Sequence, residues 1–98
     1  MMKAIFITYN QALTEKVQSI LDKMNVRGYT MFPTVWGRGT NEGEPRLGTH
    51  TWPEMNSATM TIVNEDVVDA VLEKVQKLDA LNYEVGIKAF VWNIEKVV

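Results

Sequence analysis

Cysteine is absent from the sequence, and histidine occurs only once. The absence of cysteine excludes disulfide bonds, thiol catalysis and cysteine-ligated zinc sites. Long apolar runs are also missing, since no segment approaches the roughly 18 residues that a membrane-spanning helix requires. The N-terminal stretch MMKAIFITYN contains too few apolar positions for a secretory signal peptide. We therefore expect a cytoplasmic protein that does not insert directly into a membrane.

A strong charge of either sign is missing as well. The chain has 98 residues, with 10 Lys and Arg against 12 Asp and Glu, and its formal net charge is −2. This mild acidity, without a basic cluster, predicts that the protein does not bind nucleic acid. The apolar fraction of 46% excludes a disordered chain, and the length corresponds to a single domain, residues 1–98.

Hydrophobic periodicity predicts six regular elements. Strands are expected at 3–9, 28–36, 57–63 and 87–94, where β-branched and aromatic residues cluster between turn signals. Pro33 lies inside the second strand, which must then be an edge strand or carry a bulge. Two other segments repeat apolar residues at helical spacing, and Gly28 is the expected stop signal after the first of them. The first helical face consists of Leu13, Val17, Ile20, Leu21 and Met24, and the second of Val67, Val68, Val71, Leu72, Val75 and Leu78.

The order of these elements is βαββαβ, the ferredoxin-like pattern of the α+β class. It predicts a four-stranded antiparallel sheet with both helices on one face. Both faces of the first and last strands are largely apolar, whereas a sheet with one face in water would alternate apolar and polar residues. We therefore expect the face without helices to meet another subunit in a closed homo-oligomer.

A long connection, residues 37–56, joins the second strand to the third. Neighbouring antiparallel strands need only about two to five residues, so a connection of this length is usually functional. Within it, residues 37–54 hold four of the six glycines and two of the three prolines, which favours a flexible loop. Trp52 is a large apolar ring that favours burial against a partner. We therefore expect a loop that a partner orders, with Trp52 as the anchor.

Three segments resemble the PII-type signal transduction proteins of the nitrogen-regulator superfamily. NVRGYTMFPTVWGRG (25–39) is similar to the family's stretch from the end of the first helix into its long T-loop. NEDVVDAVLEKVQKL (64–78) is similar to the second helix, and GIKAFVWNIEKVV (86–98) to the closing strand and the residues after it. The resemblance implies a homotrimer of ferredoxin-like subunits that binds adenine nucleotides in the clefts between subunits. It also implies that residues 37–56 are the T-loop, which docks on a membrane transporter or a metabolic enzyme.

Site residues follow from the resemblance position by position. Thr30 would lie near the nucleotide base, and Gly37 with Arg38 would lie at the base of the loop beside the phosphates. Lys88 would match a phosphate-contacting lysine at the start of the last strand. Gly86 is the one glycine in LNYEVGI (81–87), the stretch that corresponds to the family's glycine-rich phosphate turn.

The chain also departs from the pattern of the classical members. The phosphate turn has lost its other glycines, and Glu84 would bring negative charge towards a polyphosphate. The loop contains no tyrosine, so the family's nucleotidylation site is absent. These departures are typical of the divergent, PII-like branch, some members of which bind other nucleotides, bicarbonate or metals.

The loop carries further candidate residues. Arg38 and Arg46 are its only cations, and a guanidinium among glycines is a candidate anion site. His50 and Glu54 lie four residues apart and could ligate a divalent metal, although one histidine per chain is few for zinc. Together with Trp52, the residues Arg46, His50 and Glu54 make up the expected partner-contacting part of the loop.

Two other interpretations stay open. Ferredoxin-like oligomers include small isomerases and monooxygenases, and in an enzyme of that type His50 would be the acid–base group. The CutA family, which is also trimeric and linked to metal tolerance, has a similar shape. We nevertheless expect a non-enzymatic regulator, because no Ser, His and Asp arrangement stands out and the loop carboxylates lie on a flexible segment. Its ligand, an adenine nucleotide, another anion or a metal, would bind at subunit clefts and change the order of residues 37–56.

Overall fold

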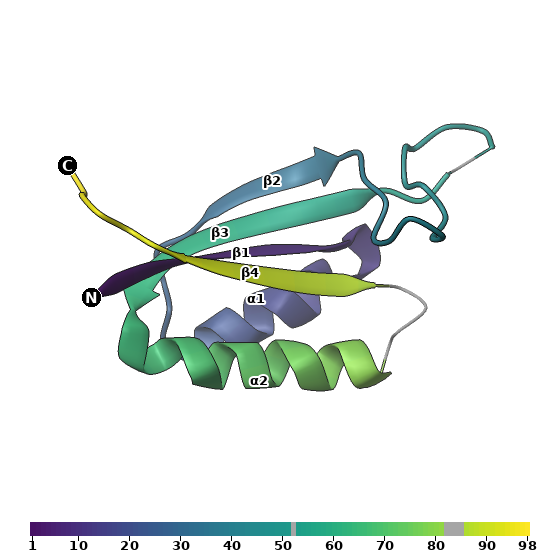
Figure 1. Ribbon diagram of the computed structural model, residues 1–98. Coiled ribbons are helices and arrows are strands. Elements are labelled where there is room, and N and C mark those ends of the chain that lie inside the picture. The colour runs from purple at the N-terminus through teal and green to yellow at the C-terminus, as the bar shows by residue number, and fades with distance from the viewer. Residues whose placement is uncertain (52, 82–85) are drawn as a thin grey trace.

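The computed structural model describes residues 1–51, 53–81 and 86–98, and its elements follow the expected βαββαβ order. Figure 1 shows one sheet with both helices packed beneath it. The chain therefore has the ferredoxin-like α+β fold that the sequence predicts. The elements are β1 (Met2–Asn10), the 3-10 turn η1 (Gln11–Leu13), α1 (Thr14–Lys23), β2 (Thr30–Val35), β3 (Asn56–Asn64), α2 (Glu65–Leu81) and β4 (Ile87–Asn93).

The sheet has the strand order β2-β3-β1-β4, and each neighbouring pair is antiparallel. β1 is central, so that Phe6 lies opposite Met60 on one side and opposite Phe90 on the other. β2 is an edge strand, and its register with β3 shifts between Phe32 and Val35. A proline cannot donate to a central ladder, which is why an edge strand or a bulge was expected at Pro33. The structure confirms this expectation, since β2 has both features.

The first helix differs from the expectation at both ends. The Asn10 side chain accepts a 2.9 Å hydrogen bond from the Ala12 N–H, and this cap starts the turn η1 before α1 begins. The helix ends at Lys23, earlier than Gly28. Asn25 supplies the left-handed conformation there, with φ of 57°, which asparagine tolerates better than most residues. The expected glycine stop was therefore wrong, and an asparagine ends the helix.

The core lies between the helices and one face of the sheet. α1 buries Val17 and Leu21, and α2 buries one residue of the predicted apolar face on each successive turn, namely Val68, Val71, Val75 and Leu78. Inside this core the hydroxyl groups of Tyr9 and Thr59 form a 2.8 Å hydrogen bond, which satisfies both buried polar groups. The central members of the core are Ile5, Ile7, Tyr9, Leu13, Val17, Leu21, Val71 and Val75.

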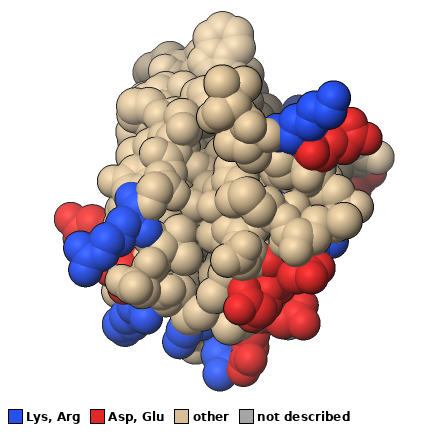
Figure 2. All heavy atoms as spheres, turned by 90° about the vertical axis from the view of Figure 1, so that its left-hand side faces the viewer, with Lys and Arg blue, Asp and Glu red and all other residues tan. Residues whose placement is uncertain are grey.

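The other face of the sheet carries no helix and is apolar. The Phe6 ring lies 6.4 Å from the Phe32 ring and 6.3 Å from the Trp92 ring, measured between centroids. Phe90 and Trp92 remain 51% and 46% exposed. In Figure 2 the upper part of the molecule, on the side of the sheet away from the helices, is largely uncharged. We call this surface, centred on Phe6, Phe32, Phe90 and Trp92, the open sheet face.

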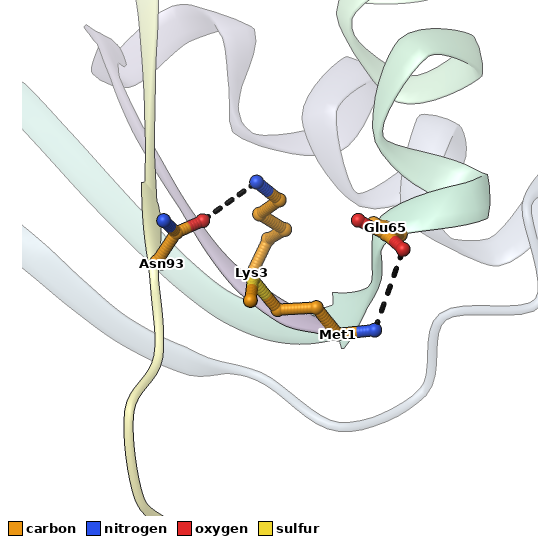
Figure 3. Close-up of polar contacts among 4 residues, drawn as sticks. All are labelled: Met1, Lys3, Glu65 and Asn93. Carbon is orange, nitrogen blue, oxygen red and sulfur yellow. Dashed lines mark hydrogen bonds and ion pairs between the residues drawn. The ribbon is translucent and has the colours of Figure 1, made fainter.

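The N-terminus lies at the end of the sheet away from the long loop (Figure 1), and Figure 3 shows the contacts that hold it there. Its ammonium group lies 3.5 Å from the Glu65 carboxylate at the start of α2. Lys3 Nζ donates a 2.6 Å hydrogen bond to Asn93 Oδ1 at the end of β4. These contacts fasten β1 to its neighbours at this end. Among the described residues, no helix is both long and apolar enough to cross a membrane.

Candidate functional site

Four strand ends converge where the long loop joins the sheet (Figure 1). β1 and β2 finish here, while β3 and β4 begin. The Asn10 N–H donates to the Gly86 carbonyl at 3.2 Å, and the Gln11 N–H donates to the Met55 carbonyl at 2.9 Å. The end of β1 is therefore bonded both to the last residues of the loop and to the residue that precedes β4.

The loop closes on itself at its base. The Gly37 N–H donates to the Arg46 carbonyl at 3.1 Å, and the Arg46 N–H returns a 2.6 Å bond to the Gly37 carbonyl. A second closure follows, in which the Gly48 N–H donates to the Glu54 carbonyl at 3.1 Å. Backbone hydrogen bonds thus close the long connection at two places, between Gly37 and Arg46 and between Gly48 and Glu54.

Arg46 occupies the centre of this region. Its side chain is only 12% exposed, and Nη1 donates a 3.1 Å hydrogen bond to Asn56 Oδ1 at the start of β3. Its Nε lies 3.9 Å from the carboxylate of Glu54, which is itself 63% exposed. The guanidinium also lies against Gly86, because a Cβ at that position would be 2.8 Å from Nη2. One side chain therefore joins the loop to the starts of two strands.

Two glycines at this site have no room for a side chain. Gly86 has a φ of 81°, a conformation that favours glycine, and it faces the Arg46 guanidinium. A Cβ on Gly37 would be 2.8 Å from Asn56 Nδ2. The structure thus brings together Gly37, Gly86, Arg46 and Asn56, which we call the loop-base cluster.

Thr30 and Lys88, the two other predicted ligand contacts, lie on opposite edges of the sheet. Thr30 begins β2 and pairs with Met60, whereas Lys88 on β4 pairs with Thr8. Three strand spacings separate the edges, roughly 14 Å. Lys88 follows Gly86 of the loop-base cluster by two residues, and Arg38 follows Gly37 directly and is exposed. Thr30 cannot join these residues within one subunit.

The outer loop holds the remaining candidates. His50 is exposed, and Glu54 lines a cleft of about 320 Å³ together with Glu44, Pro45, Thr51 and Pro53. The described part of the chain contains no group of three or more His, Asp or Glu that could hold a metal ion. A metal at His50 and Glu54 stays a prediction. Trp52 and Glu84 lie outside the described residues.

The sequence indicated Arg46 as a candidate anion site and as a partner contact, and it did not indicate Asn56. In the sequence, Asn56 is distinguished only by its position between the loop and a strand. In the structure it is buried, with 6% of its surface exposed. The buried position of Arg46 could not be read from a glycine-rich segment, because burial of a loop arginine depends on residues that the fold brings to it from β3 and β4.

Comparisons with known proteins give matches to one family and its fold. The model of the family "Nitrogen regulatory protein P-II" matches residues 2–98. No curated protein matches the chain significantly. Among solved structures, CPII, a nitrogen regulatory PII-like protein from Thiomonas intermedia K12, bound to ADP, AMP and bicarbonate, is 23% identical with a TM-score of 0.78. The alignment covers 95% of this chain and 85% of CPII.

A second solved structure has the same fold. It is a putative PII-like signaling protein from Thermus thermophilus, 22% identical, with a TM-score of 0.68. The alignment covers 95% of this chain and 86% of that protein. At these identities the two structures establish the shared fold, and the family is established by the match over nearly the whole chain.

Proposed function

The chain belongs to the nitrogen regulatory protein P-II family and is a PII-like signal transduction protein, and from that premise we propose a specific role. The protein is a homotrimeric regulator that binds an adenine nucleotide, together with bicarbonate or another small anion, at the clefts between subunits. The observation that carries this proposal is the largely buried Arg46 side chain, whose guanidinium lies against Gly86 at the base of the loop. The similar protein CPII binds ADP, AMP and bicarbonate.

The charge at the base of the loop suits an anionic ligand. Arg46 presents a fork of N–H donors that matches a carboxylate or phosphate, and Arg38 and Lys88 lie close to the loop-base cluster in the chain. Gly86 has no side chain of its own, so the Arg46 guanidinium can approach its backbone closely. Three cations thus stand at one end of a chain whose net charge is negative.

The positions of the remaining predicted contacts support a trimer. The open sheet face exposes three aromatic rings, and a patch of this kind is rarely left in water. Thr30 lies on the β2 edge and Lys88 on the β4 edge, so a site that uses both needs two subunits. A ring of subunits would bring the β2 edge of one to the β4 edge of the next.

Arg46 also supports a switching mechanism. In the described state its donors engage Asn56 and Glu54, which holds the loop against the strand ends. An anion beside Gly86 would compete for the same guanidinium and shift the loop towards a second conformation. The loop, with His50, Glu54 and Trp52, would then engage a transporter or a metabolic enzyme in the cytoplasm.

Family membership favours this regulator over the two other interpretations of the sequence. A small isomerase or monooxygenase, or a CutA-like metal-binding protein, would share the fold but not the match to the P-II family over residues 2–98. A divalent metal at His50 and Glu54 is a second ligand hypothesis, and it rests only on the spacing of those residues.

Isothermal titration calorimetry with ADP in bicarbonate buffer tests the proposal. We expect Arg46→Ala to weaken ADP binding about tenfold or more, because a hydrogen bond to a charged group contributes roughly 1.5–3 kcal/mol. Arg27→Ala is the matched control, since Arg27 is exposed and donates only to the nearby Asn25 at 3.3 Å among the described contacts. Equal affinity in the two variants, or no ADP binding by the wild-type protein, would contradict the proposal.

A further inference from the structure

A groove runs between the two helices on the side of the molecule away from the open sheet face. α1 and α2 lie side by side beneath the sheet (Figure 1). The groove has a volume of about 290 Å³, and its apolar part consists of Ile20 from α1 with Leu78 and Leu81 from α2. Leu81 is 82% exposed, so it contributes little to the core of the subunit. An apolar side chain in such a position is available to a partner.

Four lysines surround this apolar floor. Lys16 and Lys23 come from α1, and Lys74 and Lys77 come from α2. They are four of the ten Lys and Arg residues in a chain with a net charge of −2. No Asp or Glu is among the described residues that line the groove, although Glu73 lies 3.2 Å from Lys77 at one rim. The groove is therefore a local concentration of positive charge around an apolar centre.

The spacing of the groove residues is the same on both helices. In α1, Lys16, Ser19, Ile20 and Lys23 occupy positions i, i+3, i+4 and i+7, and in α2 the same positions hold Lys74, Lys77, Leu78 and Leu81. Residues at this spacing share one face of a helix. Ile20 and Leu78 also pack in the core, so the apolar part of the groove is continuous with the core and Leu81 is its exposed member.

We propose that this groove binds an amphipathic helical segment of a partner protein, with apolar residues on one side flanked by Asp or Glu. The apolar side chains would lie over Ile20, Leu78 and Leu81, and the flanking carboxylates would pair with the lysines on both rims. The lysines come from both helices and lie around the apolar residues, so a segment with an apolar centre and acidic flanks complements the groove in charge and polarity.

This docking site is independent of the nucleotide-dependent loop. It lies on the helices, whereas the loop-base cluster lies at the ends of the strands. A partner bound here would stay attached while residues 37–56 change conformation, and the loop would then act on a partner that is already held. The protein would have a constant docking surface on its helices and a ligand-controlled one on its loop.

Fluorescence anisotropy with a defined peptide tests the proposal. The probe is a fluorescein-labelled peptide of about 15 residues, with Leu at i, i+3, i+4 and i+7 and Glu on both flanks. We expect the full-length protein to bind it and Lys74→Glu to weaken binding about fivefold, as loss of an exposed charge pair allows. Lys96→Glu is the matched control: it makes the same change of charge at an exposed position in residues 94–98, outside the groove, and should leave binding unchanged.

Leu81→Ser tests the apolar contribution to peptide binding separately from the contribution of the lysines. Because Leu81 is largely exposed, the fold should survive, and we expect weaker peptide binding with an unchanged circular dichroism spectrum. Three outcomes would overturn the proposal: no binding of the peptide, equal binding by Lys74→Glu and Lys96→Glu, or binding only to vesicles of phosphatidylserine and phosphatidylcholine. The last result would assign the lysines to a membrane surface.

Discussion

Arg46 Nη1 donates a 3.1 Å hydrogen bond to Asn56 Oδ1, and this contact joins the middle of the long loop to the first residue of β3. Asn56 is buried, and its amide group also lies against Gly37, which pairs with Arg46 through the backbone. The asparagine therefore touches both sides of the loop base at once. Displacement of the Arg46 side chain would therefore affect both sides of the loop base.

Asn56→Ala removes the acceptor for Arg46. We expect the free energy of unfolding to fall by about 1–2 kcal/mol, because a partly buried charged donor loses its partner. The amides of Gly37 and Arg46 should exchange faster in hydrogen–deuterium exchange, since the loop base is no longer held. Asn93→Ala removes an exposed hydrogen bond from Lys3 and is the control, with an expected change below about 0.5 kcal/mol. Equal effects of the two variants would show that the loop base does not depend on Asn56.

Gly86→Ala places a methyl group where the Arg46 guanidinium lies. The φ of 81° adds roughly 1–2 kcal/mol of backbone strain for alanine, and the Cβ would be 2.8 Å from Nη2. We expect lower thermal stability and displacement of Arg46, seen as faster amide exchange at the loop base. Gly28→Ala is the control, because nothing lies within 4 Å of its Cβ position and its φ is not in the left-handed region. If amide exchange at the loop base were unchanged in Gly86→Ala, the conformation of the loop base would not depend on Gly86.

Tyr9→Phe tests the polar contact in the core. The Tyr9 hydroxyl lies 2.8 Å from Thr59 Oγ1 in a buried position, and its removal leaves the threonine hydroxyl unpaired. We expect a loss of about 1–2 kcal/mol in urea denaturation. Thr59→Val in the Tyr9→Phe background should cost less than it does in the wild-type protein, because both polar groups are then gone. Additive losses would mean that the two hydroxyl groups do not stabilise each other.

Trp92→Glu tests the open sheet face as the surface between subunits. Trp92 is 46% exposed and packs against Phe6, so a carboxylate there would be buried without a partner in a trimer. We expect sedimentation velocity to show monomers in place of trimers. Leu81→Glu changes an even more exposed apolar residue on the helices and should leave the trimer intact. A trimer that survives Trp92→Glu would place the interface elsewhere.

The order of the elements could be predicted from the sequence because each element carries its own local pattern. The helical faces of α1 and α2 repeat at a period that no strand shares. Pro33 predicted that β2 would be an edge strand or carry a bulge, and β2 lies at the edge with a register shift. The end of α1 could not be predicted in the same way. Gly28 is the stronger stop signal in the sequence, yet Asn25 adopts the left-handed conformation.

The candidate site was predictable in part. Gly37 and Gly86 were identified through the resemblance, and the structure brings both to the loop base. Arg46 was recognised as a cation but not as the centre of the site, because its neighbours Asn56 and Gly86 are 10 and 40 positions away in the sequence. Contacts between such distant residues depend on the register of β1 with β3 and β4, which no local pattern reveals.

Native mass spectrometry of the wild-type protein in bicarbonate buffer, with and without ADP, tests the central claim most directly. We predict a species of about three times the subunit mass of 11.2 kDa, and additions of the mass of ADP, up to one for each subunit cleft. Monomers or dimers would contradict the trimeric assembly, and a trimer that gains no ADP would contradict nucleotide binding at the loop base.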